Sequence, residues 1–139
     1  MNQINFEKKL KEIDLKVTPA RMAVLNLLEK TKQPIDVNTI INSVNKQGIK
    51  TDPATIFRII NHLTEKGLAI KVQFEDKKTR YELANREHHH HLVCDKCGDI
   101  IDISTKAVEN LQKKIKEKYG FLVKRHSLEF FGLCSDCQN

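Results

Sequence analysis

The residues best suited to binding a metal are concentrated in one stretch, residues 87–98, with the sequence Glu-His-His-His-His-Leu-Val-Cys-Asp-Lys-Cys-Gly. It contains four of the chain's six histidines and two of its four cysteines. The other two cysteines, Cys134 and Cys137, repeat the C-x-x-C spacing near the C-terminal end. Imidazole and thiolate groups are common ligands of zinc and other divalent transition metals. The second half of the chain is therefore predicted to bind metal.

The cysteines form two C-x-x-C knuckles, a spacing that predicts one tetrahedral zinc site with four thiolate ligands. Its ligands would be Cys94, Cys97, Cys134 and Cys137. Two disulfides or a redox-active thiol pair are the alternatives. The chain has no membrane-length apolar run and no signal-peptide core at its start, which predicts a cytoplasmic protein. Zinc is favoured because paired cysteines in the cytoplasm are more often metal ligands than disulfides.

The four consecutive histidines lie on a predicted strand, residues 88–93. Successive side chains of a strand point to opposite faces, so the histidines form two pairs that serve two different sites. Each pair has further candidate ligands elsewhere in the chain. The two candidate sets are Glu82, His89, His91 and Asp102, and His88, His90, Glu109 and His126.

The rest of the second half supplies the elements that position these ligands. A returning strand is predicted at 99–103, a helix at 105–119 and a long strand at 121–131. Ser104 is expected to cap the helix, and Gly120 is expected to end it. The inward residues of the helix are predicted to be Val108, Leu111 and Ile115.

The first half predicts four short helices followed by a two-stranded hairpin. The helices are expected at 4–13, from Pro19 to about 30, from Asp36 to Gly48, and at 53–66. Between the second and third helices, Gln33-Pro34-Ile35 is predicted to form a plain turn. The hairpin comprises residues 68–74 and 79–83 with a charged tip between them. This layout predicts an α+β protein: an N-terminal winged helix-turn-helix at 1–84 and a small α/β domain at 85–139, joined near 84–86.

The net charge of +6 is unevenly distributed. Residues 1–84 contain 15 Lys and Arg against 10 Asp and Glu, whereas residues 85–139 contain 9 against 8. A basic first half predicts an anionic partner, with nucleic acid as the first candidate, although a merely soluble basic surface is the alternative. In a helix-turn-helix protein the recognition helix, here 53–66, enters the major groove. The residues predicted to face DNA are Lys16, Arg21, Thr55, Arg58 and Asn61.

Five motifs in this order resemble the ferric uptake regulator (Fur) family. They span nearly the whole chain, and the ordered set is more specific than any one motif. The motifs are Val17-Thr18-Pro19-Ala20-Arg21, Ala54-Thr55-Ile56-Phe57-Arg58, Arg80-Tyr81-Glu82-Leu83, His88-His89-His90-His91-x-x-Cys94-x-x-Cys97-Gly98, and Gly132-Leu133-Cys134-x-x-Cys137.

The resemblance implies a homodimeric, metal-dependent repressor whose winged helix binds A/T-rich inverted repeats in double-stranded DNA. It implies that the C-terminal domain dimerises, that the four cysteines hold structural zinc, and that the Glu82 set holds a regulatory metal. The His88 set matches an additional site, in which His90 stands where some members have Asp. Lys16, Phe57 and Arg58 match DNA-contacting positions, with Phe57 in place of the more usual Tyr.

The sequence departs from the family pattern in the turn between the second and third helices. Many members have a histidine there that joins the regulatory metal, whereas this chain has Gln33-Pro34. The zinc-sensing branch often uses a further cysteine near the end of the wing, and this chain has no fifth cysteine. The peroxide-sensing branch usually has Asp where Glu82 stands. The regulatory metal is thus expected to be Fe²⁺ or Zn²⁺, with Mn²⁺ or Ni²⁺ also open.

The function predicted from these features is metal-responsive repression of genes for metal homeostasis. Glu82 lies before the hinge and the other regulatory ligands lie after it, so metal binding is expected to fix the geometry of the two domains for DNA. A peroxide-stress sensor of the same family is the alternative. A metal-buffering protein and a zinc hydrolase are alternatives from other classes, and we expect the protein not to be an enzyme.

Overall fold

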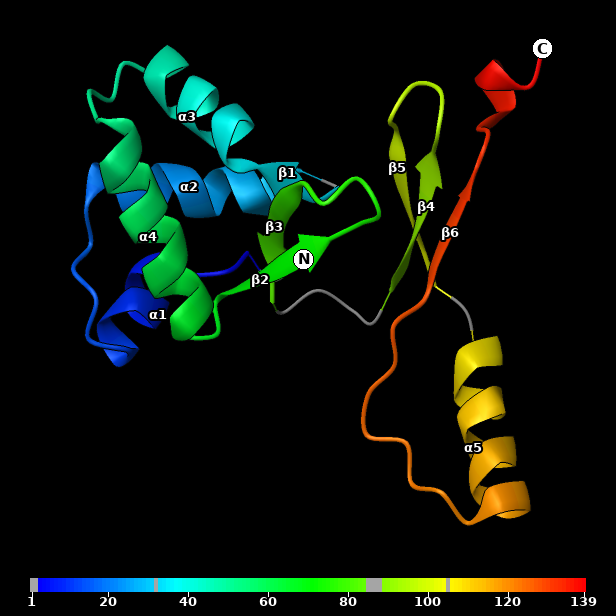
Figure 1. Ribbon diagram of the computed structural model, residues 1–139. Coiled ribbons are helices and arrows are strands. Elements are labelled where there is room, and N and C mark those ends of the chain that lie inside the picture. The colour runs from blue at the N-terminus through cyan, green and yellow to red at the C-terminus, as the bar shows by residue number, and fades with distance from the viewer. Residues whose placement is uncertain (1–2, 32, 85–88, 105) are drawn as a thin grey trace. The chain divides into compact units, whose positions relative to one another are not determined.

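The chain divides into two compact units, Met1–Asn85 and Arg86–Asn139 (Figure 1). The computed structural model describes residues 3–31, 33–84, 89–104 and 106–139. The first unit contains four helices and three strands among these residues. Its elements are α1 (Phe6–Glu12), α2 (Pro19–Lys30), β1 (Ile35–Asp36), α3 (Val37–Lys46), α4 (Pro53–Glu65), β2 (Ala69–Gln73) and β3 (Thr79–Leu83).

Three helices of the first unit begin at side-chain caps. Thr18, Asp36 and Asp52 precede α2, α3 and α4, and each side-chain oxygen accepts a hydrogen bond from the backbone N–H three residues further on. The donor–acceptor distances are 3.2, 2.8 and 2.7 Å. Such caps satisfy an amide that the helix itself leaves without a partner, so they define where the helix starts.

The core of the first unit lies between the four helices and the sheet. Apolar residues spaced along one face of each helix are fully buried, as helical periodicity predicts. The largest of them are Leu10, Leu25, Leu28, Ile40, Ile56, Ile60 and Leu63. The sheet has the strand order β1–β3–β2, and β2 and β3 form the predicted antiparallel hairpin. Helices followed by this hairpin give the winged helix-turn-helix arrangement.

The turn predicted at Gln33-Pro34-Ile35 is wrong at its last residue. Ile35 belongs to β1 and pairs with Tyr81 of β3, while Asp36 pairs with Arg80. A strand of two residues has no alternation of its own to recognise. It exists because β3, far along the chain, offers hydrogen-bonding partners.

In its described part, the second unit is a three-stranded sheet with one α-helix. Its elements are β4 (His90–Cys94), β5 (Ile100–Ile103), α5 (Ala107–Tyr119), β6 (Glu129–Gly132) and the 3₁₀ turn η1 (Ser135–Cys137). The strand order is β5–β4–β6, with β5 antiparallel and β6 parallel to β4. Figure 1 shows α5 beyond one end of this sheet, with residues 120–128 running back to β6. Because β4 is the central strand, it pairs with a neighbouring strand on each side.

Three predictions for the second unit are wrong. The strand predicted at 121–131 is limited to Glu129–Gly132, and Phe121 and Leu122 are each 63% exposed. The residue preceding α5 is Lys106 rather than the predicted Ser104, and it makes no side-chain capping bond. Of the residues predicted to face inward from α5, Val108 is buried but Leu111 is 57% exposed. In this unit, therefore, some apolar residues that the sequence pattern assigns to the core lie on the exposed surface of the chain.

Among the described residues, no helix combines the length and the apolar character that crossing a membrane requires.

Candidate functional site

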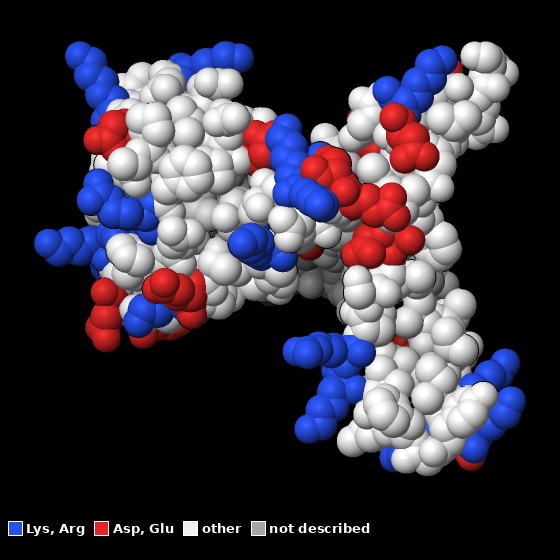
Figure 2. Space-filling view, viewed as in Figure 1, with Lys and Arg blue, Asp and Glu red and all other residues white. Residues whose placement is uncertain are grey.

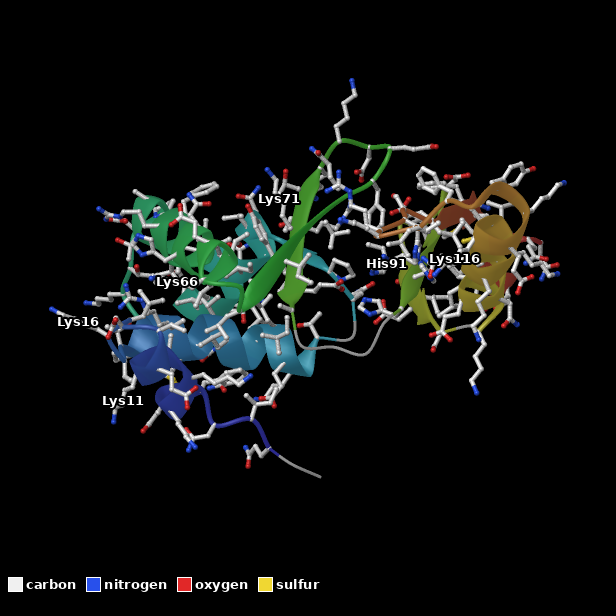
Figure 3. All side chains as sticks on the ribbon, turned by 90° about the horizontal axis from the view of Figure 1, so that it is seen from below. Lys11, Lys16, Lys66, Lys71, His91 and Lys116 are labelled. Atoms are coloured by element: carbon white, nitrogen blue, oxygen red, sulfur yellow. The ribbon has the colours of Figure 1, made fainter. Side chains whose placement is uncertain are left out.

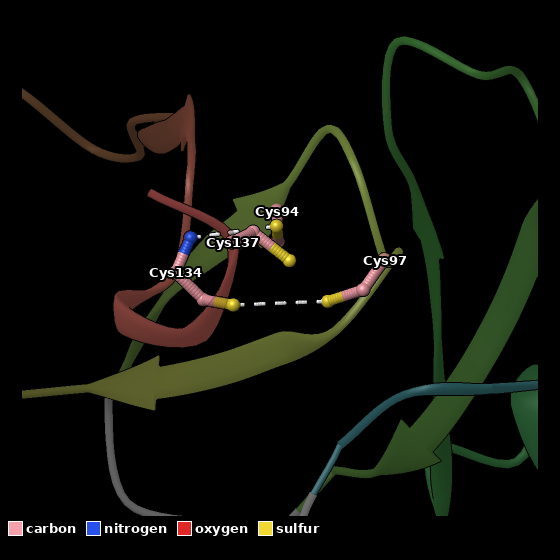
Figure 4. A group of neighbouring side chains, drawn as sticks. All are labelled: Cys94, Cys97, Cys134 and Cys137. Atoms are coloured by element: carbon pink, nitrogen blue, oxygen red, sulfur yellow. Dashed lines mark hydrogen bonds between the residues drawn. The ribbon is translucent and has the colours of Figure 1, made fainter. Parts of the chain in front are cut away.

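The four cysteines converge at one end of the second unit's sheet (Figure 4). Cys94 ends β4, Cys97 follows in the turn to β5, and the C-terminal pair lies directly after β6. Their sulfur atoms all lie within 4.8 Å of one another, and the Cys97 and Cys134 Sγ atoms are 3.8 Å apart. β6 runs parallel beside β4, with Gly132 paired to Cys94, and so brings the second knuckle to the first. All four are free thiols.

The surroundings of the thiols favour a cation at their centre. The backbone N–H of Cys134 donates to Cys94 Sγ at 3.4 Å, and this bond, together with amide donors of the first knuckle, lowers the pKa of Cys94 to about 6. By contrast, the hydrogen bond between the side chains of Cys137 and Cys134 raises the pKa of Cys137 to about 12. Once one thiol is ionised, its neighbours resist ionisation unless a positive charge joins them. Four sulfurs at this separation fit the tetrahedral thiolate set of a structural zinc.

A second group of potential ligands lies on β4, on β5 and at the residue before β4. One ligand atom from each of His89, His91 and Asp102 falls within 4.8 Å of the others. His91 is directly opposite Asp102 in the β4–β5 pair, and its Nε2 lies 3.6 Å from Asp102 Oδ1. The rings of His89 and His91 meet edge to face with centroids 4.9 Å apart. Two imidazoles and a carboxylate in this arrangement can hold a divalent transition metal.

The next histidine along the strand, His90, faces away from this group. Its ring is buried, and its Nε2 lies 3.4 Å from Nε2 of His126, which is on the coil before β6. Gln112 of α5 contacts the other ring nitrogen of His126 at 2.7 Å. Neighbouring histidines on β4 thus belong to different clusters, as strand alternation predicted.

The predicted additional site is only partly assembled among the described residues. Glu109 is exposed on α5 and does not join His90 and His126 in a group of three potential ligands. His88, the fourth predicted member, lies outside the described residues. Glu82, which was predicted for the regulatory site, is a buried residue of β3 in the first unit. Gln33, in the turn without histidine, is separated from β1 by Pro34 and is half-buried.

The residues predicted to face DNA lie on two parts of the first unit. On α4, Phe57 is 47% exposed, Arg58 and Asn61 are exposed, and Thr55 is half-buried. Arg58 Nη2 donates to Thr55 Oγ1 at 3.2 Å, which holds the guanidinium on the outer face of the helix. Figure 2 shows lysine and arginine side chains projecting from the first unit on the side where Figure 1 shows α4.

The other predicted DNA-facing residues lie at the start of α2. Figure 3 shows Lys16 extending into solvent from the outer edge of the first unit. Arg21, half-buried, turns back instead: its Nη1 donates to the backbone carbonyl of Lys16 at 2.9 Å. Sequence reasoning missed this bond, which assigns Arg21 the task of holding the loop that presents Lys16. No local sequence pattern signals it.

Comparison with known proteins gives consistent matches over the whole chain. Residues 12–131 match the model of the Ferric uptake regulator family. A ferric uptake regulation protein of Neisseria gonorrhoeae is 35% identical over 139 residues, which cover 99% of this chain and 96% of that protein.

Two solved structures share the fold. The Helicobacter pylori ferric uptake regulator, described as having three functional metal binding sites, superposes with a TM-score of 0.84 at 27% identity, covering 96% of this chain and 89% of that one. A Campylobacter jejuni peroxide stress regulator gives a TM-score of 0.71 at 31% identity, covering 96% and 100%.

Proposed function

Because the chain belongs to the ferric uptake regulator family, whose members are metal-responsive transcriptional regulators that bind DNA and act as dimers, we propose that it represses genes of metal homeostasis when a regulatory metal is bound. The observation that carries this proposal is the cluster of His89, His91 and Asp102 in a separate position from the four cysteines. A chain with a structural site and a second, chemically different site has the means both to stay folded and to respond to metal.

The four cysteines are the proposed ligands of structural zinc. Bound there, zinc would supply folding free energy to a unit with few buried apolar residues. The residues that would hold it are Cys94, Cys97, Cys134 and Cys137. The proposed role is to keep β4 and β6 side by side, so that the histidines of β4 stay in position.

The proposed regulatory ligands are Glu82, His89, His91 and Asp102, for Fe²⁺ or Zn²⁺, with Mn²⁺ as a further possibility. Glu82 belongs to the first unit, and the other three belong to the second. Ligation by side chains from both units would restrict their movement relative to one another and favour the geometry that binds DNA. His88, His90, Glu109 and His126 are proposed for the additional site.

The proposed DNA is a double-stranded A/T-rich inverted repeat, whose symmetry matches that of a homodimer. Contacts are proposed from Lys16, Thr55, Phe57, Arg58 and Asn61, with Arg21 supporting Lys16. The proposed dimer surface is the apolar surface of the second unit, since most of the large exposed apolar side chains lie there. They are Ile101, Leu111, Tyr119, Phe121, Leu122, Phe130, Phe131 and Leu133.

The test is DNA binding by the purified full chain with and without a regulatory metal, measured by fluorescence anisotropy on an A/T-rich inverted-repeat duplex. Zinc is kept at the cysteines, and Fe²⁺ (without oxygen), Mn²⁺ or Zn²⁺ is then added. Affinity is expected to rise at least tenfold with the effective metal. Equal affinity with and without every metal would contradict metal-dependent repression.

A second candidate function is peroxide sensing, which the match to the Campylobacter jejuni peroxide stress regulator favours. A peroxide sensor loaded with Fe²⁺ should lose DNA binding on brief exposure to hydrogen peroxide, with an oxidised histidine detectable by mass spectrometry. Retention of DNA binding under that treatment favours metal homeostasis. The identity of Glu82, where the peroxide-sensing branch usually has Asp, also favours metal homeostasis.

A further inference from the structure

The central position of β4 gives His91 a neighbour on each side. It pairs with Asp102 on β5 and with Glu129 on β6. Residues paired across neighbouring strands direct their side chains to the same face of the sheet. Two carboxylate-bearing residues therefore flank one metal-ligand candidate, and the sequence pattern drew attention to only one of them.

The Asp102 side of this arrangement is already assembled, since its carboxylate lies 3.6 Å from the His91 ring nitrogen. Glu129 is half-buried, and its described partner is the exposed hydroxyl of Ser127, which donates to its two carboxylate oxygens at 3.3 and 3.4 Å. Both distances exceed the roughly 2.5–3.0 Å of a good hydroxyl–oxygen hydrogen bond. The Glu129 carboxylate is thus only weakly held where it lies.

We propose that Glu129 is a further ligand of the regulatory metal, in addition to Glu82, His89, His91 and Asp102. This inference rests on the proposed function, because it concerns the same site. Neighbouring strands lie about 4.8 Å apart, and a glutamate side chain has three rotatable bonds. Rotation away from Ser127 brings the carboxylate toward the ion that His91 and Asp102 hold. Glu129 thereby supplies a donor in place of the histidine that many family members have where this chain has Gln33.

The added ligand changes the chemistry of the site. Within the second unit, the donors become two imidazole nitrogens and two carboxylate groups. Carboxylate oxygen suits harder cations such as Mn²⁺, imidazole suits iron and zinc, and thiolate, which selects zinc, is lacking from this donor set. With Glu82, the proposed regulatory set has five donor groups, which exceeds the four-coordinate geometry usual for zinc. The proposed donor set therefore favours Fe²⁺ or Mn²⁺ over Zn²⁺ as the metal that the site senses.

The experiment compares Mn²⁺ and Zn²⁺ binding by the full chain with zinc already at the cysteines, using competition with a chelator of known affinity. Glu129→Gln, which keeps the size of the side chain, should weaken Mn²⁺ binding at least tenfold and Zn²⁺ binding less than threefold. Glu129→Asp, which keeps the charge on a shorter side chain, should give an intermediate Mn²⁺ affinity. Glu117→Gln, on the exposed face of α5, is the matched control and should bind both metals as the unchanged chain does.

The outcomes separate this inference from the function on which it rests. If Asp102→Asn loses Mn²⁺ binding while Glu129→Gln retains the affinity of the unchanged chain, Glu129 is not a ligand, and the regulatory site remains. If the unchanged chain takes up no metal beyond the zinc at its cysteines, the proposed function itself fails. Equal weakening of Mn²⁺ and Zn²⁺ by Glu129→Gln would overturn the inferred preference.

Discussion

Lys78, in the turn between β2 and β3, forms an ion pair with Asp36, the residue that caps α3. Lys78 Nζ lies 2.7 Å from Asp36 Oδ2, while Asp36 Oδ1 accepts a hydrogen bond from the Thr39 amide at 2.8 Å. One carboxylate therefore joins the start of a helix to the turn of the hairpin. Partial burial disfavours its charge, but the hydrogen bonds from Lys78 and Thr39 outweigh this, and the pKa of Asp36 lies below its ordinary value.

This arrangement predicts a pH-dependent contribution of Asp36 to stability. Asp36→Ala removes both the cap and the ion pair, and is expected to lower the free energy of unfolding by about 1–2 kcal/mol near neutral pH. Asp36→Asn keeps a good cap and loses only the charge, so it should cost less. Because folding lowers the pKa of Asp36, its charge stabilises the protein above the ordinary pKa of 3.8, and this stabilisation is lost as the pH falls through the lower folded value.

Denaturant unfolding between pH 3 and pH 7 measures this effect. The difference between the unchanged chain and Asp36→Asn should be constant above about pH 5 and shrink below the ordinary carboxyl pKa. Lys78→Met serves as the partner variant, because it removes the ion pair and leaves the cap. A difference that grows on acidification would contradict this account of the ion pair.

Removing one cysteine should empty the proposed structural zinc site. In Cys134→Ser the remaining three thiols no longer form a tetrahedral set, and a serine hydroxyl is a poor replacement for a thiolate. Elemental analysis is expected to show about one tightly bound zinc per chain in the unchanged protein and much less in the variant. The second unit should also become sensitive to protease. Asp136→Asn, within the same knuckle but outside the thiol set, should retain the zinc.

Arg58 should contribute to DNA binding without affecting metal binding. Arg58→Gln removes a guanidinium that Thr55 holds on the exposed face of α4. Affinity for the effective operator duplex is expected to fall by about 10- to 100-fold, equivalent to roughly 1–3 kcal/mol. Lys30→Gln, at the opposite end of α2 from Lys16, is the charge-matched control. If the protein were a metal buffer, neither Arg58→Gln nor Lys30→Gln would alter a specific affinity for DNA.

The exposed apolar side of α5 should be needed for dimer formation. Leu111 is 57% exposed in the single chain, so Leu111→Asp should leave the chain folded and weaken its dimer at least tenfold. Analytical ultracentrifugation over a range of concentrations measures the dissociation. Ile70→Asp changes a comparably exposed side chain of the first unit and should leave the dimer intact. A monomer–dimer equilibrium unchanged by Leu111→Asp would place the dimer surface elsewhere.

The sequence predicted the helices of the first unit well because their starts are encoded locally. Thr18-Pro19 and Asp52-Pro53 each combine a capping side chain with a proline that suits the first turn, and α2 and α4 begin where these pairs predict. β1 was missed because a two-residue strand depends on β3 for its existence. Local sequence signals thus predicted α2 and α4, whose capping residues lie next to them in the chain. They missed β1, which forms only by pairing with the distant β3.

In the second unit, the grouping of the candidate ligands was easier to predict than the elements that carry them. Alternation along β4 correctly separated His91 from His90, because the two faces of a strand are fixed by backbone geometry. The long strand was overpredicted because Phe121 and Leu122 read as core residues but are exposed in the single chain. Sequence periodicity does not distinguish burial within a chain from burial against another copy. The place of Glu129 beside His91 depended on strand order, which no local pattern contains.

The run of histidines on β4 has a consequence for the alignment of the sheet. If β4 slipped by one residue against β5 so that His90 came to lie opposite Asp102, the imidazole chemistry there would survive. The same slip would move Cys94 away from the other three cysteines and turn it to the opposite face. Identical neighbouring histidines do not by themselves specify the register of β4. The four-cysteine cluster does specify it, and so determines which site each histidine joins.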